Sequence, residues 1–322
     1  MGRWLAGRFA QAIVTAAVAA VLMFFLMRAA PGDPLARLSE DRQLTPDQAA
    51  VLRERYGLDA PPAAQFASFV GGLLRGDLGT SIEYGRPVTA LLSERLPASL
   101  VLGGTVLLLT FGLGTWLGAL QAIRRGPIDR TLGAASLALY ATPSFWLALV
   151  LAWLVGVEWR LLPAAGMHDP FLPVDAGAGE RIADLLRHLV LPALTLAAVN
   201  MAATMRYQRA AMLEALEQPY IEAARARGLG ERRVHWRHGW RNALFPVVTL
   251  FGLWLPLLVA GSVFVEKIFA WPGLGALAAD AVASRDYPLL MGASLLVTGL
   301  VVAGSLVADV AYAALDPRVR RP

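Results

Sequence analysis

Six long apolar runs that contain no charged residue constrain the fold of this chain more than any other feature. The runs are Phe9–Met27, Leu96–Ile123, Thr131–Val157, Leu189–Met205, Asn242–Val265 and Tyr287–Ala308. A helix of about 20 apolar residues is long enough to cross the hydrocarbon core of a bilayer. We therefore predict an all-α membrane protein with six transmembrane helices. The first run is long for a signal-peptide core and lacks a small-residue cleavage site, so we interpret it as a retained helix.

The composition agrees with a membrane protein. Hydrophobic residues make up 57% of the chain and charged residues only 16%, whereas soluble domains carry about 25% charged residues. The mean hydropathy is +0.53. The absence of cysteine excludes disulfides and thiolate metal sites. The 29 basic residues are spread over many loops, which indicates a membrane topology signal and no nucleic-acid partner.

The distribution of charge predicts the orientation in the membrane. Six spans place both termini on one side, and the segments on that side carry sixteen arginines against six acidic residues. The segments on the other side carry thirteen basic and seventeen acidic residues. Because positive charge stays on the cytoplasmic side, we expect both termini in the cytoplasm. The predicted layout is then residues 1–28 as N-terminus and first span, 29–95 as an extracytoplasmic loop or cap, and 96–322 as a five-helix core that includes the loop 206–241.

Two local features follow from proline and capping chemistry. In the cap, Asp47–Tyr56 should be helical, with Thr45 as N-cap, Pro46 at the first position and Gly57 as the stop. In the third span, the segment Thr142–Trp146 contains Pro143, which permits a kink.

The loop 206–241 contains a short helix predicted at Pro219–Arg227. Pro219 fits a first helical position, and Gly228 fits the left-handed residue that ends a helix. An isolated helix of this length is marginal in water, so we expect a partner surface to hold it. The three-and-four spacing places four residues on one face, namely Tyr220, Ala223, Ala224 and Arg227.

The same loop resembles a known family. The pattern Glu222-Ala223-Ala224 followed by Gly228 is similar to the EAA signature of bacterial ABC importer membrane subunits. The stretches 220–229 and 237–246 resemble the dipeptide, oligopeptide and nickel permease branch, as do Pro31–Pro34, Gly76–Ser81 and 315–321. The resemblance implies the type I permease fold, in which this short helix is a coupling helix that docks on a separate ATPase. On that basis the ATPase-coupling residues are Tyr220, Glu222, Ala223, Ala224, Arg225, Arg227 and Gly228.

The resemblance also implies the partners and the substrate class. The expected partners are a second homologous permease subunit, two ATP-binding-cassette ATPases, an extracytoplasmic solute-binding protein and membrane lipid. The expected solutes are di- or oligopeptides, with nickel or other small solutes as alternatives. The expected location is the bacterial inner membrane.

The chain lacks the motifs of an enzyme. A phosphate-binding P-loop needs a Gly-Lys pair, and the only lysine, Lys267, follows Glu266. We therefore expect no ATPase activity, no catalytic residue and no cofactor in this chain, with ATP and Mg²⁺ bound by the partner ATPases. His235 and His238 lie three apart, but tryptophans and arginines around them favour an interfacial helix over a metal site.

Two alternative functions remain from the sequence. One is a secondary transporter or channel that works without ATPases, although such carriers usually keep ionisable groups within their spans, where this chain has almost none. The other is a receptor or scaffold without transport. Asp309, at the end of the last predicted span, should find water or a cation near the inner face.

Overall fold

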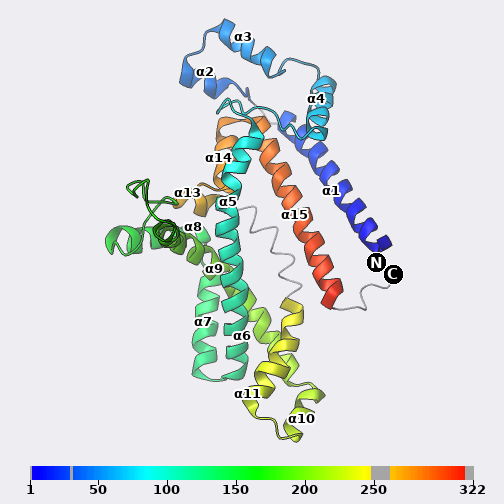
Figure 1. Cartoon of the computed structure of the whole chain (residues 1–322), viewed down its shortest axis with the longest axis vertical. Helices are drawn as coiled ribbons and strands as arrows, with labels where there is room; N and C mark the ends of the chain where they lie inside the picture. The colour runs from blue at the N-terminus through cyan, green and yellow to red at the C-terminus, as the bar shows by residue number, and fades with distance from the viewer. Residues whose placement is uncertain (1, 30–31, 248–261, 316–322) are drawn as a thin grey trace. The chain divides into compact units, whose positions relative to one another are not determined.

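The computed structural model describes residues 2–29, 32–247 and 262–315. Over these residues the regular structure is helical, and the only strand-like pairing is an isolated bridge between Thr80 and Pro87 (Figure 1). The predicted all-α fold is confirmed. No cis peptide bond occurs in the described part of the chain.

Four helical stretches in the described residues are long and apolar enough to cross a bilayer. They are Gly7–Ala29 in α1 (Gly2–Ala29), Val88–Ile123, Ala178–Leu216 (α9), and Tyr287–Leu306 in α15 (Tyr287–Leu315). Each overlaps a predicted span. The predicted span at Asn242–Val265 lies mostly outside the described residues, as does the 315–321 stretch, so the count of six stays a prediction. The side chain of Asp309 is also outside the described part.

The third predicted span is broken into two helices. α7 (Pro127–Ala141) is followed by α8 (Ser144–Leu151) and the π-helical η2 (Ala152–Glu158), and the two parts meet at 102°. Thr142 (φ −86°, ψ 123°) and Pro143 (φ −61°, ψ 132°) are both extended. A proline disfavours helical backbone at the residue before it, which explains the break at Thr142. The predicted interruption is present, and it is much sharper than a kink.

The chain forms two compact units, which we describe separately. The first comprises Met1–Ser99 and Pro272–Ala303, and the second Leu100–Trp271 and Gly304–Pro322. In the first unit, the start of α5 (Val88–Leu107) packs with α14 (Leu274–Ser284) and α15. Their shared core contains Val88, Leu91, Leu92, Leu274, Leu277 and Leu289. Three further helices, α2 (Ala36–Arg42), α3 (Pro46–Arg55) and α4 (Pro62–Leu74), also belong to this unit.

Helix α3 begins and ends where the sequence predicts. The hydroxyl of Thr45 accepts a hydrogen bond from the amide of Gln48 (3.3 Å), and the Gln48 side chain accepts one from the amide of Thr45 (2.9 Å). This reciprocal capping box satisfies two helix-end donors. Gly57 follows the helix with a φ of +62°.

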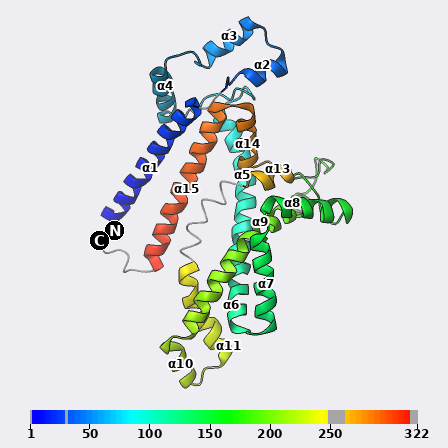
Figure 2. The same ribbon diagram turned by 180° about the vertical axis from the view of Figure 1, so that it is seen from behind.

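In the second unit, three helices run side by side. η1 (Leu108–Leu113) continues into α6 (Gly114–Ile123), and α6 and α7 both lie along α9, as both views show (Figures 1 and 2). After α9 come α10 (Pro219–Ala226), α11 (Glu231–Arg233), the π-helical η3 (Val234–Gly239) and helical residues 240–247. The remaining described helix of this unit is α13 (Val263–Ile268).

Candidate functional site

Helix α9 positions the predicted coupling helix. It has 39 residues, which corresponds to about 58 Å at 1.5 Å per residue, well beyond the thickness of a bilayer core. The predicted span ended at Met205, but the helix continues to Leu216. Gln218 is extended (φ −76°, ψ 146°) and starts α10. The short helix is thus joined to a membrane-length helix through two residues.

The start of α10 has the features expected from its sequence. Pro219 lies in the first turn, where no amide donor is required. Glu222 is also in the first turn, where the helix dipole favours a negative charge. The side chain of Gln218 makes no capping hydrogen bond, so proline and the acidic residue define this end of the helix.

Gly228 ends α10 in a Schellman motif. Its amide donates to the carbonyl of Arg225 (2.9 Å), and the amide of Leu229 donates to the carbonyl of Ala224 (3.3 Å). The φ of Gly228 is +78°, a left-handed conformation that suits glycine. Helix α10 ends at Ala226, with Arg227 as its cap residue, so the predicted boundary is confirmed within one residue.

The buried side of α10 packs against the segment that follows it in the chain. Ile221, Ala224 and Val234 are fully buried and form one cluster, with Leu216 and Leu229 packed around it. Two of these residues lie on α10 three positions apart, and Val234 opens η3. The short helix is therefore held by the chain itself as well as by any partner.

The opposite side of α10 is exposed. Six of the seven predicted coupling residues lie there or at its end, namely Tyr220, Glu222, Ala223, Arg225, Arg227 and Gly228. Tyr220, the largest of them, is 38% exposed. Ala224 is the exception, because it is buried in the loop cluster and does not share the exposed face of Tyr220 and Ala223. The apolar pair Ile221 and Ala224 was the sequence signal for this buried side.

A charged link joins α10 to α11. Arg225 donates to Glu231 through Nε (2.8 Å) and Nη2 (3.3 Å), and His235 Nε2 lies 3.0 Å from the same carboxylate. The hydrogen bond that Arg225 donates to Glu231 lowers the pKa of Glu231 below its ordinary value and raises the pKa of Arg225. Both side chains are largely exposed, so the link orients the loop more than it stabilises the protein.

Metal binding has no support in the residues that the structure describes. In these ranges no group of three or more His, Asp or Glu side chains is placed to hold a metal ion. His235 is engaged by Glu231, as described above. His168 and His188 both contact Asp184, with Nδ1 to carboxylate distances of 3.1 Å.

Two glycines that the sequence analysis did not single out set the packing of α6 on α9. A Cβ at Gly114 would lie 3.1 Å from Met201 Cγ and 3.2 Å from Thr204 Cβ. A Cβ at Gly118 would overlap the Met205 carbonyl oxygen and lie 2.9 Å from Gln208 Cβ. The spacing Gly114-x-x-x-Gly118 is a known signal for close helix packing in membranes, so the sequence does contain a signal for this contact.

Polar contacts reinforce this helix packing at the end nearer α10. Arg209 of α9 donates to both oxygens of Asp129 in α7, at 2.8 and 2.7 Å. The guanidinium of Arg206 lies 4.1 Å from the ring centre of Tyr140. Helices α6 and α7 are thus attached to the stretch of α9 that leads to the short helix.

In the first unit, two of the stretches that carry the family resemblance, Pro31–Pro34 and Gly76–Ser81, both contact the residue pair Arg285 and Asp286. The guanidinium of Arg285 lies directly over Gly32, whose φ is +116°. The buried carboxylate of Asp286 accepts hydrogen bonds from the Ser81 hydroxyl (2.5 Å) and from the amides of Glu83 (3.1 Å) and Leu289 (3.1 Å). Stretches far apart in sequence are therefore joined by buried polar contacts.

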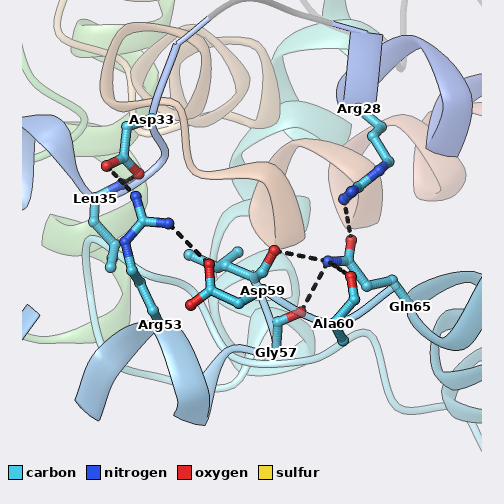
Figure 3. Close-up of polar contacts among 9 residues, drawn as sticks. Arg28, Asp33, Leu35, Arg53, Gly57, Asp59, Ala60 and Gln65 are labelled. Atoms are coloured by element: carbon cyan, nitrogen blue, oxygen red, sulfur yellow. Dashed lines mark hydrogen bonds and ion pairs between the residues drawn. The ribbon is translucent and has the colours of Figure 1, made fainter. Parts of the chain in front are cut away.

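A polar network holds the predicted cap together (Figure 3). Arg53 lies between Asp33 (2.5 Å) and Asp59 (3.2 Å), and the hydrogen bond that it donates to Asp33 raises the pKa of Arg53. The amide of Gln65 donates to three carbonyls near Gly57, and its oxygen accepts from Arg28 (2.7 Å). A cavity of about 790 Å³ lies beside this network.

Comparison with known families defines the class of protein. Residues 110–321 match the family described as "Binding-protein-dependent transport system inner membrane component". Residues 1–103 match its N-terminal counterpart, "Binding-prot-dependent transport system membrane comp, N-term". The chain therefore belongs to the inner membrane components of binding-protein-dependent transport systems, and it is a multi-pass membrane protein.

Individual relatives cover most of the chain. The oligopeptide transport system permease protein AppB of Bacillus subtilis is 40% identical over 301 residues, which is 93% of each chain. The dipeptide transport system permease protein DppB of Escherichia coli is 36% identical over 316 residues, and the di/tripeptide permease DppB of Pseudomonas aeruginosa is 37% identical over 313 residues. Both of these matches also cover 93% of each chain.

Proposed function

We propose that this chain is the membrane subunit of an ATP-binding-cassette importer and forms half of the pathway for short peptides. One observation carries the proposal. The short helix α10 has an exposed face, follows a membrane-length helix directly, and ends at a glycine that closes the Glu-Ala-Ala signature. A helix held in this way is suited to transmit motion from a partner to the spans.

The coupling residues have separate roles in this proposal. Tyr220, Ala223 and Arg227 form the surface that docks on an ATPase, since they are exposed along one side of α10. Glu222 and Gly228 define the two ends of the helix, and Arg225 joins it to Glu231. Ala224 positions the helix from its buried side.

The substrate class is argued from the relatives. The names of three of them refer to oligopeptides, dipeptides and di/tripeptides. We assign short peptides to this chain on that basis. Nickel, which the sequence resemblance also allowed, is the less favoured solute because none of these three names includes it.

The assembly follows the sequence predictions. We place both termini in the cytoplasm of a bacterial cell, residues 29–95 outside the membrane as a cap, and the five-helix core at 96–322. A second homologous permease completes the pathway. Two ATPases bind ATP and Mg²⁺, this chain binds no cofactor, and a solute-binding protein delivers the peptide from outside.

The mechanism uses the continuity of α9. Closure of the ATPases on ATP moves α10, and the buried cluster at Ile221 and Val234 transmits this movement to the end of α9. Helices α6 and α7 follow, because Gly118 packs on the α9 backbone and Asp129 pairs with Arg209. The helices then tilt as one body and open the pathway outward.

Reconstitution tests the proposal. The chain is placed in vesicles with its cognate second permease, ATPases and binding protein, and uptake of a labelled dipeptide is measured. We expect uptake only with ATP, and no ATP hydrolysis by the purified chain alone. Uptake by this chain without ATPases, driven by an ion gradient, would support the secondary transporter instead.

A further inference from the structure

A groove in the second unit carries more positive charge than its structure explains. It lies beside the residues that follow α10 and has a volume of about 890 Å³. Its principal lining residues are Arg232, Arg233, Trp236, Arg237, Trp240 and Arg241. We call this surface the arginine–tryptophan groove.

The four arginines are exposed, and in the part of the chain that the structure describes they have no acidic partner. Within the described ranges, none of these guanidinium groups lies within ion-pair distance of a carboxylate, and no acidic residue lines the groove. Nearby arginines behave differently: Arg209 is paired with Asp129, and Arg225 with Glu231. Four uncompensated cations in one groove repel one another, so an anion bound among them would be stabilised.

The wall of the groove is apolar. Trp236 and Trp240 meet edge to face with 5.7 Å between their ring centres, and both pack against the cluster around Met212. Trp116 of α6 and Leu244 complete the lining. Arg233, Arg237 and Arg241 are spaced four apart, and the π-helical turn of η3 keeps such residues near one side. A charged rim therefore lies next to a fixed aromatic surface.

This pairing of chemistry fits an amphipathic anion. Tryptophan prefers the headgroup level of a bilayer, and basic pockets at the cytoplasmic ends of spans bind anionic headgroups. Trp116 lies in a membrane-length helix, whereas Arg232 and Arg233 belong to α11, the next helix after α10. The groove thus extends from a membrane-spanning helix to the coupling loop.

We propose that the arginine–tryptophan groove binds the phosphate headgroup of an anionic phospholipid from the cytoplasmic leaflet. The inference rests on the orientation given in the proposed function. A lipid held there contacts η3 through Trp236 and Arg237, and the first residue of η3, Val234, packs against Ile221 and Ala224 of α10. Its occupancy steadies the coupling loop, and coupling between ATP hydrolysis and uptake then depends on anionic lipid.

The test measures lipid retention by the assembled transporter. The complex is prepared in nanodiscs that contain phosphatidylcholine with or without phosphatidylglycerol, and the phosphatidylglycerol that stays bound is measured by native mass spectrometry. The variant is Arg233→Gln, Arg237→Gln, Arg241→Gln. The matched control is Arg124→Gln, Arg125→Gln, Arg130→Gln, which removes the same charge from exposed residues of another loop.

We expect the groove variant to lose phosphatidylglycerol affinity by about tenfold to a hundredfold, from the usual contribution of each cation near an anionic surface. The control should retain the lipid, and excess inorganic phosphate should not displace it. Equal loss in the control, unchanged retention in the variant, or displacement by phosphate would each overturn the proposal. Loss of ATPase association with unchanged lipid retention would show that a protein covers the groove, and would also overturn it. Failure of the proposed function is visible separately, because the ATPases would then not co-purify with the unaltered chain.

Discussion

Gly228 and Gly118 are both required as glycines, but for different physical reasons. Gly228 has open space around it and a left-handed φ of +78°, so any cost of a side chain arises from the backbone. Gly118 is part of a helix with ordinary backbone, and the cost arises from the neighbouring α9. Substitutions can therefore separate the end of the coupling helix from the packing of the helices.

At Gly228, alanine should weaken the helix end by about 1–2 kcal/mol, because a Cβ is unfavourable in the left-handed region. Asparagine tolerates that region better and should cost less. Aspartate should add roughly 0.3–1 kcal/mol of repulsion at the negative end of the helix dipole. We expect ATPase association and peptide uptake to be reduced least by asparagine, more by alanine and most by aspartate, while the abundance of the protein in the membrane stays constant. Full uptake by Gly228→Asp with normal ATPase association would contradict the coupling role.

At Gly118, alanine should force α6 away from α9, because the added carbon overlaps the Met205 carbonyl oxygen. Overpacking of this kind costs about 1–3 kcal/mol. The matched control is Gly112→Ala, since Gly112 lies in the same continuous helix and a Cβ there meets nothing within 4 Å. The unfolding midpoint in detergent should fall for Gly118→Ala. It should not fall for the control and should rise slightly, because alanine is a better helix former than glycine. Equal midpoints would show that the close approach is not needed.

At the scale of helices, uncharged runs predicted where the spans lie but not where the helices end. The run at Leu189 ends before Arg206, whereas α9 continues because Arg206 contacts Tyr140 and Arg209 pairs with Asp129. The length of an uncharged run measures the hydrocarbon thickness, and a helix can extend beyond it. Local signals performed better: Thr45 and Gly228 both define helix ends as predicted.

The burial of residues in the coupling helix could be predicted only in part, for a similar reason. Spacing along α10 grouped Ala224 with the exposed Tyr220 and Ala223, because it could not predict which side of the helix meets the rest of the chain. That choice is made by Val234, which packs on Ile221 and Ala224 after the chain has turned at Gly228. A contact across a turn depends on the tertiary fold and cannot be read from helical periodicity alone.

The continuity of α9 gives a prediction for the element. Ala210 is exposed and lies on α9 between Arg206 and α10. Ala210→Pro removes one helical hydrogen bond and introduces a steric clash with the preceding turn, which destabilises the helix by about 3 kcal/mol. We expect the complex to assemble and hydrolyse ATP while peptide uptake is lost, because motion no longer reaches the spans. Ala210→Gly, at about 1 kcal/mol, should retain most uptake. Uptake by the proline variant equal to that of the unaltered chain would exclude α9 as the transmitting element.

At the scale of the whole molecule, the charge distribution and the helices predict the same topology through independent arguments. Loops 124–130 and 206–241 are rich in arginine. Among the described residues, the helical stretches that adjoin them are Val88–Ile123 and Ala178–Leu216, which are long enough to cross a membrane, and the bent pair α7 and α8 with η2. If the coupling loop is cytoplasmic and α14 is outside the cell, the segment between residue 241 and α14 must cross the membrane an odd number of times. Labelling can decide this for the predicted span at Asn242–Val265.

The natural chain has no cysteine, so single cysteines can be introduced without a background signal. We choose four exposed positions, Glu54, Arg125, Glu217 and Ala283. An impermeant thiol reagent added to intact cells should label cysteines at Glu54 and Ala283, and label those at Arg125 and Glu217 only after permeabilisation. The cysteine-free chain controls for other proteins. Labelling at Glu217 from outside would refute the cytoplasmic coupling loop, and protection of Ala283 alone would remove the crossing between residue 241 and α14. The complete pattern requires a span at Asn242–Val265, because no other uncharged run of that length lies between Glu217 and Ala283.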